Sequence, residues 1–237
     1  MTDYHQVFRF KKFNLYQDKA AMKVGTDGVL LGAWVNVKNK NNLLDVGSGS
    51  GLIALMMAQR NQQAKIDAVE IDPNAVEQTR YNFEISPWKN RLQVYHSDYR
   101  RYQSVRKYDL IVSNPPYFDE NYYSGNRQRD RARHTKDLKL TDLVEKSIEL
   151  LSTNGHIALI LPYQKLRELQ DISKHNGLFF NKITYIKGNP TAKIKRFLCT
   201  LSFEENKLKT ETLIIEIKRH QYTPEYVALT GEYYLKM

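Results

Sequence analysis

Residues 43–58 constrain the fold more than any other part of the chain. Residues 43–46 form a short apolar run typical of a buried strand, and a loop with three alternating glycines follows at 47–51. A second apolar run, at 52–58, has the wide apolar face of a buried helix. A strand, a glycine loop and a helix in this order bring backbone N–H groups and a helix N-terminus up to a ligand. We therefore expect an α/β fold with a ligand site at this loop.

Strand and helix patterns alternate along the rest of the chain. Apolar runs of strand length cover residues 65–70, 92–96, 108–113 and 155–162. Helical spacing of apolar residues covers 72–83 and 138–151, and a more polar helix is expected at 164–175. Three further strand candidates, rich in β-branched and aromatic residues, lie at 179–186, 197–203 and 213–217. This alternation predicts a mostly parallel sheet covered by helices on both faces.

The first 42 residues have a different character. Phe8, Phe10, Phe13 and Leu15 alternate with polar residues, which indicates a half-exposed strand or hairpin. Thr26-Asp27 precedes an apolar stretch at 29–34 and predicts a helix capped by these side chains. Because no linker or repeat interrupts the chain, we expect a single domain over residues 1–237. In it, an extension (1–42) packs over the ligand site of a core (43–237) that ends in additional strands.

Charge and cysteine content narrow the setting. The 237-residue chain carries a formal net charge of +10, an excess that favours polyanionic partners or anionic membrane surfaces. Its single cysteine, Cys199, cannot form an internal disulfide, and this favours a reducing compartment. Asp3 and Arg9 stand where a signal peptide needs an apolar core, and no apolar run reaches membrane-spanning length. We expect a cytoplasmic protein that does not bind membranes.

The glycine loop alone fits several kinds of nucleotide-binding fold. Its Gly-x-Gly-x-Gly spacing lacks the two-residue gap of the dinucleotide fingerprint, and no lysine ends it as in a Walker loop. Asp45, two residues before the first glycine, would repel a pyrophosphate but attract a cationic ligand. S-Adenosylmethionine carries an ammonium and a sulfonium and has no phosphate, so the loop favours this cofactor over NAD.

Three residues at the next strand ends suit the rest of such a cofactor. Glu70, about 20 residues past the glycines, can accept both ribose hydroxyls. Ile71 can pack on the adenine face, and Asp98 can accept the adenine amine. Each acid on its own is more commonly a solvated carboxylate at a strand end. The three positions together with the glycines favour S-adenosylmethionine.

The tetrapeptide Asn114-Pro115-Pro116-Tyr117 follows the strand predicted at 108–113. Its two prolines fix φ and remove two N–H donors, so the turn presents carbonyl oxygens with few competing donors. The Asn114 amide oxygen and a backbone carbonyl can accept both hydrogens of an NH₂ group, while Tyr117 can stack on a flat substrate. Adenine and a glutamine side chain both carry such a group. A proline-stiffened turn with a buried tyrosine is the structural alternative.

Two basic clusters are candidates for RNA contact. The first follows the tetrapeptide and contains Arg127, Arg129, Arg131, Arg133 and Lys136. The second lies ahead of a predicted strand and contains Lys193, Lys195 and Arg196. A solvated loop is the alternative for both clusters. The six histidines are scattered without ligand spacing, and with one cysteine this gives no reason to expect a metal site.

The glycine loop, Glu70, Asp98 and the Asn-Pro-Pro-Tyr motif resemble the class I S-adenosylmethionine-dependent amino methyltransferases. Phe10-Lys11-Lys12-Phe13, residues 22–34 and residues 222–226 are similar to the bacterial valine-tRNA adenine-N6 methyltransferase family, which modifies adenine 37 beside the anticodon. The resemblance spans essentially the whole chain. It implies a Rossmann-like class I fold with an antiparallel edge strand, and methylation of an unpaired adenine in tRNA by a monomer.

The same resemblance implies the site residues. The catalytic motif would be Asn114, Pro115, Pro116 and Tyr117. The cofactor would contact Lys23, Thr26, Asp27, Asp45, Gly47, Gly49, Gly51, Glu70, Ile71, Asp98 and Asn114.

Two rival functions use the same residues differently. Methylation of a protein glutamine, as in a release factor, fits the tetrapeptide equally well. However, enzymes of that kind carry a helical N-terminal domain, and 42 residues leave too little room for one. A non-catalytic RNA-binding protein could keep the fold, but binding alone gives no reason for the paired acceptors of the motif.

Overall fold

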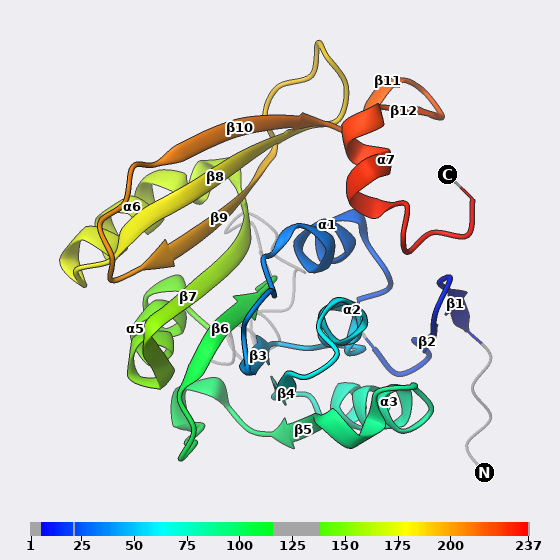
Figure 1. Cartoon of the computed structure of the whole chain (residues 1–237), viewed down its shortest axis with the longest axis vertical. Coiled ribbons are helices and arrows are strands. Elements are labelled where there is room, and N and C mark those ends of the chain that lie inside the picture. The colour runs from blue at the N-terminus through cyan, green and yellow to red at the C-terminus, as the bar shows by residue number, and fades with distance from the viewer. Residues whose placement is uncertain (1–5, 21, 116–137, 237) are drawn as a thin grey trace, which may run out of the picture.

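The structure is a computed structural model that describes residues 6–20, 22–115 and 138–236 (Figure 1). In chain order, its helices are α1 (Thr26–Trp34), α2 (Leu52–Arg60), α3 (Pro73–Glu84), α5 (Leu140–Leu150), α6 (Leu166–His175) and α7 (Pro224–Thr230). Its strands are β1 (Val7–Arg9), β2 (Asn14–Tyr16), β3 (Asn42–Val46), β4 (Lys65–Glu70), β5 (Leu92–His96), β6 (Tyr108–Ser113), β7 (Leu151–Pro162), β8 (Phe179–Lys187), β9 (Arg196–Ser202), β10 (Lys209–Ile214), β11 (Glu216–Lys218) and β12 (Gln221–Tyr222). Single 3₁₀ turns occur at η1 (Lys89–Arg91), η2 (Tyr99–Arg101) and η3 (Tyr163–Lys165).

Eight strands form the central sheet in the order β10-β8-β9-β7-β6-β3-β4-β5. The five strands from β7 to β5 are parallel, and β9 runs antiparallel to both β7 and β8. The mostly parallel α/β fold predicted from the sequence is confirmed. One detail differs, because the antiparallel strand lies between β7 and β8 and not at the edge. The edge is formed by β10, which pairs in parallel with β8.

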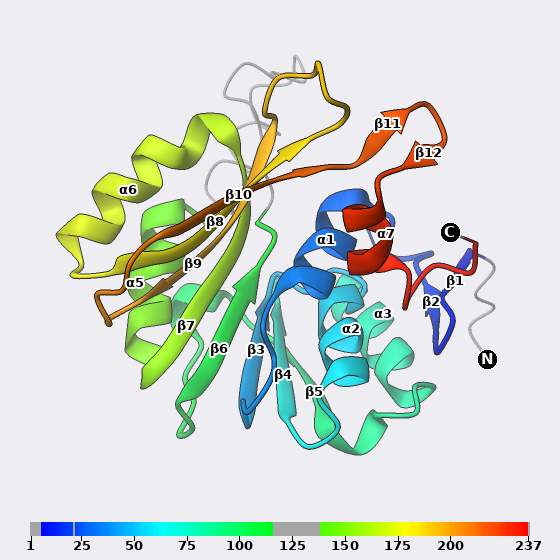
Figure 2. The same cartoon turned by 45° about the horizontal axis from the view of Figure 1, so that its top comes forward.

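Helices cover both faces of this sheet (Figure 2). One apolar cluster joins α1, α2, α3 and α7 to one face, and a second cluster joins α5 and α6 to the other. Adjacent residues of a strand point to opposite faces, so in β3 Leu43 belongs to the first cluster and Leu44 to the second. Asp45, next in this alternation, lies on the face covered by α2.

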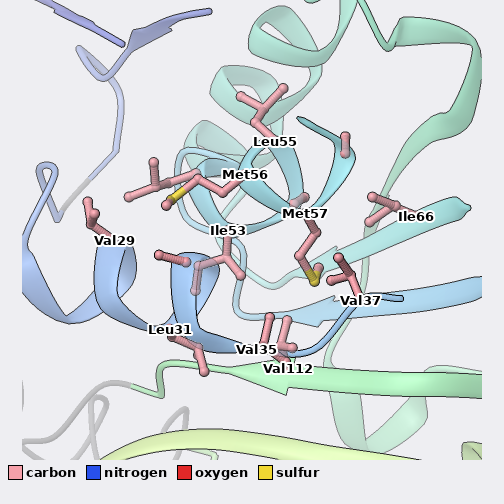
Figure 3. Packing of buried hydrophobic residues seen from close by; sticks show 14 of the residues in the cluster. Val29, Leu31, Val35, Val37, Ile53, Leu55, Met56, Met57, Ile66 and Val112 are labelled. Carbon is pink, nitrogen blue, oxygen red and sulfur yellow. The ribbon is translucent and has the colours of Figure 1, made fainter. Parts of the chain in front are cut away.

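Close packing of α1 against α2 explains a glycine inside α1. A Cβ atom at Gly32 would lie 2.7 Å from the Met56 sulfur, so any side chain there would push the two helices apart. Figure 3 shows Met57 of α2, Ile66 of β4 and Val37, which follows α1, pointing toward one another. Burying side chains of this size contributes about 1.5–3 kcal/mol each.

Among the element boundaries that differ from the sequence predictions, three have a clear structural reason. The N-cap of α1 is Gly25, with no side-chain cap, so Thr26 and Asp27 lie inside the helix and do not cap it. Strand β7 begins at Leu151, four residues early, because it pairs with β6 on both sides of a bulge. Strand β10 begins at Lys209, four residues before the predicted start at 213. The sequence does not reveal this half of the edge strand, because it is exposed and polar and carries no apolar pattern.

The expected N-terminal hairpin is present as β1 and β2. Its aromatic residues pack on the C-terminal segment, where Phe10 forms a bridge with Tyr234. Among the described residues, no helix is long and apolar enough to cross a membrane.

Candidate active site

A cavity of about 340 Å³ opens at the carboxyl ends of β3, β4 and β6. In an open parallel sheet, this is where ligands bind. The volume falls within the range of about 300–1,000 Å³ that is usual for small-molecule sites. Its walls consist of Met22, Val46, Gly47, Gly49, Val69, Glu70, Ile71, Asp72, Ala75, Ser97, Asp98, Tyr99, Ser113, Asn114, Pro115 and Leu138.

The glycine loop after β3 has a backbone that only glycine adopts readily. Gly47, Gly49 and Gly51 have φ angles of 71°, 57° and 83°. The Gly47 N–H donates to the Val69 carbonyl at 2.8 Å, which ties the start of the loop to β4. Gly51 is the N-cap residue of α2. It packs on Phe83, whose ring would lie 2.8 Å from an added Cβ. The loop therefore holds its shape through contacts with β4 and α3.

Two buried polar side chains of α3 hold this loop in place, and neither was predicted as a site residue. The Thr79 hydroxyl donates to the Gly49 carbonyl at 2.8 Å. The Asn82 amide donates to the carbonyls of Ser50 and Tyr16, at 2.8 and 2.7 Å, and accepts from the Tyr16 N–H at 2.9 Å. The available signal was that both polar residues fall into the helical spacing set by the apolar residues Val76 and Phe83, on the face of α3 that is buried. Asn82 thus connects the glycine loop to the end of the N-terminal hairpin.

Asp45 lies beneath the loop, fully buried. One of its carboxylate oxygens accepts from the Ala54 N–H of α2 at 3.1 Å, and the other finds no hydrogen-bond partner among the described residues. Burial raises the pKa of this carboxyl to about 7, and the charge of Glu70 adds to the effect. A cation in the neighbouring cavity would stabilise its ionised form.

Glu70 ends β4 and lies on the cavity wall. One carboxylate oxygen accepts from the Gly49 N–H at 2.9 Å, and the other accepts from the N–H groups of Ile71 and Asp72 at 2.8 and 2.9 Å. These bonds hold the carboxylate against the glycine loop and use three of its roughly four lone-pair sites, so the oxygen that accepts from Gly49 keeps one for a ligand hydroxyl. Ile71, the predicted adenine contact, lines the same cavity and is largely exposed.

Asp98 also lines the cavity, but its carboxylate already has a partner. Arg100 binds both of its oxygens, with a shortest N–O distance of 2.6 Å, and holds the pKa of Asp98 below its usual range. The backbone N–H of Arg100 also donates to the Asp98 carboxylate at 3.0 Å. A ligand amine at this position would have to share the carboxylate with Arg100.

The Asn-Pro turn enters the cavity from β6. The Ser113 hydroxyl donates to the Val46 carbonyl at 2.8 Å, which locks the end of β6 to β3. Asn114 is half-buried and Pro115 is buried, and both line the cavity that the glycine loop and Glu70 also line. The predicted Pro116 and Tyr117 lie outside the described residues.

The predicted contacts at the N-terminal segment are not among the residues lining the cavity. The Lys23 ammonium donates to the Gln17 carbonyl at 2.5 Å, and Thr26 is exposed. The Asp27 carboxylate binds Arg196 at 3.0 Å. Met22 lines the cavity in their place. It belongs to the stretch at 22–34 that carries the family resemblance, but it was not among the predicted contacts.

The second basic cluster lies in the loop between β8 and β9. Lys193 and Lys195 are exposed there, whereas Arg196 begins β9 and pairs with Asp27. The first cluster, from Arg127 to Lys136, lies outside the described residues. No group of three or more histidine, cysteine or acidic side chains among the described residues could hold a metal ion.

The donor set of the cavity fits S-adenosylmethionine. Asp45 does not line the cavity, but its buried carboxylate, next in the chain to Val46 of the cavity wall, has an oxygen without a partner among the described residues. Glu70 has a lone pair for a ribose hydroxyl. Ile71 and Leu138 supply apolar surface for a flat base. The loop contains glycines at both positions that line the cavity, Gly47 and Gly49, so no Cβ atom obstructs a ligand there.

Comparisons with known proteins agree with this geometry. The family model described as "Methyltransferase small domain" matches residues 20–179. A curated relative from Christiangramia forsetii, a tRNA1(Val) (adenine(37)-N6)-methyltransferase, is 46% identical over 98% of this chain and 99% of its own length. The chain belongs to the tRNA1(Val) (adenine(37)-N6)-methyltransferase family. Relatives of the same name from Flavobacterium johnsoniae and Trichodesmium erythraeum are 47% and 45% identical, over 98% and 97% of this chain and 100% and 98% of theirs.

Solved structures support the fold of this methyltransferase. A protein from Agrobacterium tumefaciens, described as a predicted O-methyltransferase, matches with a TM-score of 0.68 and 20% identity over 87% of this chain and 96% of its own. P. horikoshii TYW2, solved in complex with MeSAdo, matches with a TM-score of 0.60 and 16% identity over 84% and 71% of the two chains. At these identities the likeness concerns the fold alone.

Proposed function

We propose that this protein transfers the methyl group of S-adenosylmethionine to N6 of adenine 37 in tRNA1(Val). The observation that carries the proposal is the position of Asn114 and Pro115. They line the same cavity as the glycine loop and Glu70, so a target amine at the turn would meet a cofactor on the loop. The names of the curated relatives, which align over nearly the full chain, support the choice of tRNA and of the adenine.

The cofactor would lie between the glycine loop and the ends of β4 and β5. Glu70 would accept the ribose hydroxyls, Ile71 would pack on the adenine, and Asp45 would balance the positive charge. Asp98 would contact the adenine amine alongside Arg100. Because Glu70 is already fixed by three backbone N–H groups, little side-chain freedom is lost on binding.

Bound S-adenosylmethionine supplies an electrophilic methyl group. The task of the protein is to make a poor nucleophile effective, because the lone pair of an adenine amine is delocalised into its ring. The Asn114 Oδ1 atom and the Pro115 carbonyl would accept the two amine hydrogens and direct the lone pair at the methyl group. Catalysis of this kind depends on orientation and fixed dipoles and needs no ionised base. Tyr117 would stack on the base, a contact worth about 1–3 kcal/mol in nucleic-acid sites.

The substrate is best presented as an unpaired base in a tRNA loop, since such a base needs no extrusion from a helix. We propose that Arg127, Arg129, Arg131, Arg133 and Lys136 contact this RNA near the reacting base, with Lys193, Lys195 and Arg196 farther away. We also propose that the protein acts as a monomer in the cytoplasm.

The test is incubation with labelled S-adenosylmethionine and two valine tRNA transcripts, one with adenine and one with guanine at position 37. We expect label in N6-methyladenine from the first transcript and none from the second. Label in both transcripts would contradict the choice of adenine 37. A parallel incubation contains a release factor in addition. Label in this added protein and in neither RNA would contradict the proposal and favour glutamine methylation.

A further inference from the structure

A small hairpin continues the edge of the sheet beyond β10. Strand pairing between β10 and β8 runs past both named strands, because the Ile215 N–H donates to the Lys187 carbonyl at 2.9 Å and Glu216 donates to Gly188 at 3.0 Å. Strands β11 and β12 then fold back, and the Thr223 N–H returns to the Ile215 carbonyl at 3.0 Å. Tyr222 packs on Tyr226 of α7, with ring centroids 5.2 Å apart. The base of the hairpin is therefore fixed on two sides.

The loop between β8 and β9 lies against this base and is also held in shape. The Asn189 side-chain oxygen accepts from the N–H groups of Thr191 and Ala192 at 3.1 and 2.8 Å, which closes a local turn. The Lys195 N–H donates to the Ile186 carbonyl at 3.3 Å, and the Lys195 carbonyl accepts from Tyr163 at 3.0 Å. A ligand that binds this loop meets a preorganised surface, so little ordering entropy is lost.

Exposed cations without acidic partners gather on these two elements. Lys218 and Arg219 stand at the turn of the hairpin, and Lys193 and Lys195 on the loop, all exposed. Within residues 6–20, 22–115 and 138–236, none of these four side chains forms an ion pair. Arg196, which follows Lys195, does have a partner, because it pairs with Asp27 at 3.0 Å. The loop and the hairpin turn thus carry positive charge that no ion pair among the described residues neutralises, and this charge suits a polyanion.

This surface lies at the same edge of the sheet as the candidate active site, but at a distance from it (Figure 2). Strand β8 runs parallel to β6, so their carboxyl ends share one edge. Four strand spacings separate β6 from β10, and at about 4.8 Å each they amount to roughly 19 Å. One nucleotide cannot span that length, which corresponds to several stacked base pairs of an RNA stem.

We propose that the β11–β12 hairpin and the β8–β9 loop together bind the phosphate backbone of the base-paired stem that carries the target loop. The proposal rests on the proposed function, because it places the reacting adenine at Asn114. The stem would extend along the sheet edge from β6 toward β10. Phosphate contacts of this kind set position and affinity and do not read the base sequence.

The experiment compares two double variants of equal charge. Lys218→Ala with Arg219→Ala removes the cations of the hairpin turn, and Lys207→Ala with Lys209→Ala removes two exposed lysines at the opposite end of β10. Affinity is measured over a range of salt for a full valine tRNA transcript and for a short unpaired oligonucleotide with the loop sequence. A third variant, Lys193→Ala with Lys195→Ala, tests the loop independently should the hairpin variant melt early.

For the hairpin variant and full tRNA, we expect the slope of log affinity against log salt to become shallower by about 0.9 for each lost phosphate contact, about 1.8 in all. If affinities converge near 1 M salt, this is a loss of roughly 30-fold near 0.15 M. The loop variant should lose a similar amount. The control variant should bind tRNA like the parent protein, and no variant should lose affinity for the short oligonucleotide.

An unchanged slope in both test variants, an equal loss in the control, or an equal loss on the oligonucleotide would each overturn the proposal. Methylation by the unaltered protein is measured on the two full valine tRNA transcripts, one with adenine and one with guanine at position 37. Methylation of adenine 37 with unchanged binding in both variants would refute only the stem surface. No methylation of either transcript would instead refute the proposed function.

Discussion

Replacement of Asp45 by asparagine tests the electrostatic design of the cofactor site. The carboxyl group is fully buried, and one oxygen lacks a partner among the described residues. Asparagine has nearly the same shape and can still accept the hydrogen bond from the Ala54 N–H. The substitution therefore removes the buried charge and leaves the packing of β3 against α2 in place.

The structure gives the sign and size of the effect on stability. Folding raises the pKa of Asp45 from an ordinary value near 3.8 to about 7. Between these values the folded chain binds a proton that the unfolded chain has released, so the free energy of unfolding falls as the pH rises from about 4 to about 7. At about 1.4 kcal/mol for each tenfold change in proton affinity, the full fall is about 4 kcal/mol. The Asp45→Asn variant has no ionisable group at this position and should escape the fall.

Urea unfolding without cofactor, from pH 4.5 to pH 8.5, measures this difference. We expect the Asp45→Asn variant to match the parent near pH 4.5 and to exceed it by up to about 4 kcal/mol at pH 8, a rise in Tm of roughly 8–16 °C. The control is Asp171→Asn, the same change at an exposed position of α6. Equal pH profiles for the parent and the Asp45→Asn variant would refute the reasoning.

The same variant should bind S-adenosylmethionine more weakly. A positively charged ligand favours ionised Asp45, so parent affinity should rise with pH up to about 7, by at most tenfold per pH unit, and then level off. The variant should lose this pH dependence. Calorimetric titration at pH 6, 7 and 8 measures it, and a pH-independent affinity in the parent would show that the Asp45 charge does not sense the ligand.

Three further substitutions separate the roles of the cavity residues. Asn114→Ala should leave cofactor affinity largely intact and abolish most methyl transfer, since it removes an acceptor for the target amine; calorimetry with a turnover assay decides, and near-normal turnover would contradict the mechanism. Glu70→Ala should weaken cofactor binding by about 1.5–3 kcal/mol, the scale of charge-assisted hydrogen bonds, without changing tRNA affinity; the opposite pattern would show that Glu70 serves the RNA. Asn82→Ala should lower the free energy of unfolding by about 3 kcal/mol and also weaken cofactor binding, because Ser50 and Tyr16 lose their buried partner. Amide hydrogen exchange at Tyr16 should increase in that variant, and unchanged protection there would contradict the link.

Much of the core could be predicted from the sequence, because its signals are local. Buried parallel strands read as continuous apolar runs, and positive φ angles in the loop at 47–51 require glycine. The strand ends that carry Glu70 and Asp98 follow from the same pattern, and the structure brings both to one cavity with the Asn114 turn. Parallel strands end at the same edge of a sheet, so the predicted parallel arrangement is enough to bring these residues to that edge.

Contacts between distant segments were decided only by the tertiary structure. No local pattern reveals that Asn82 holds Tyr16 and Ser50 together or that Asp27 is engaged by Arg196. Nor does any local pattern reveal that β8, which precedes β9 in the chain, pairs on its outer side and so places β9 inside the sheet. Strand β10 adds a further edge beyond β8, and its exposed half lacks an apolar signal. Composition indicates an excess of positive charge, but neutralisation depends on which acid folds next to which base. Among the described residues, that pairing leaves Lys193, Lys195, Lys218 and Arg219 at this edge without an acidic partner.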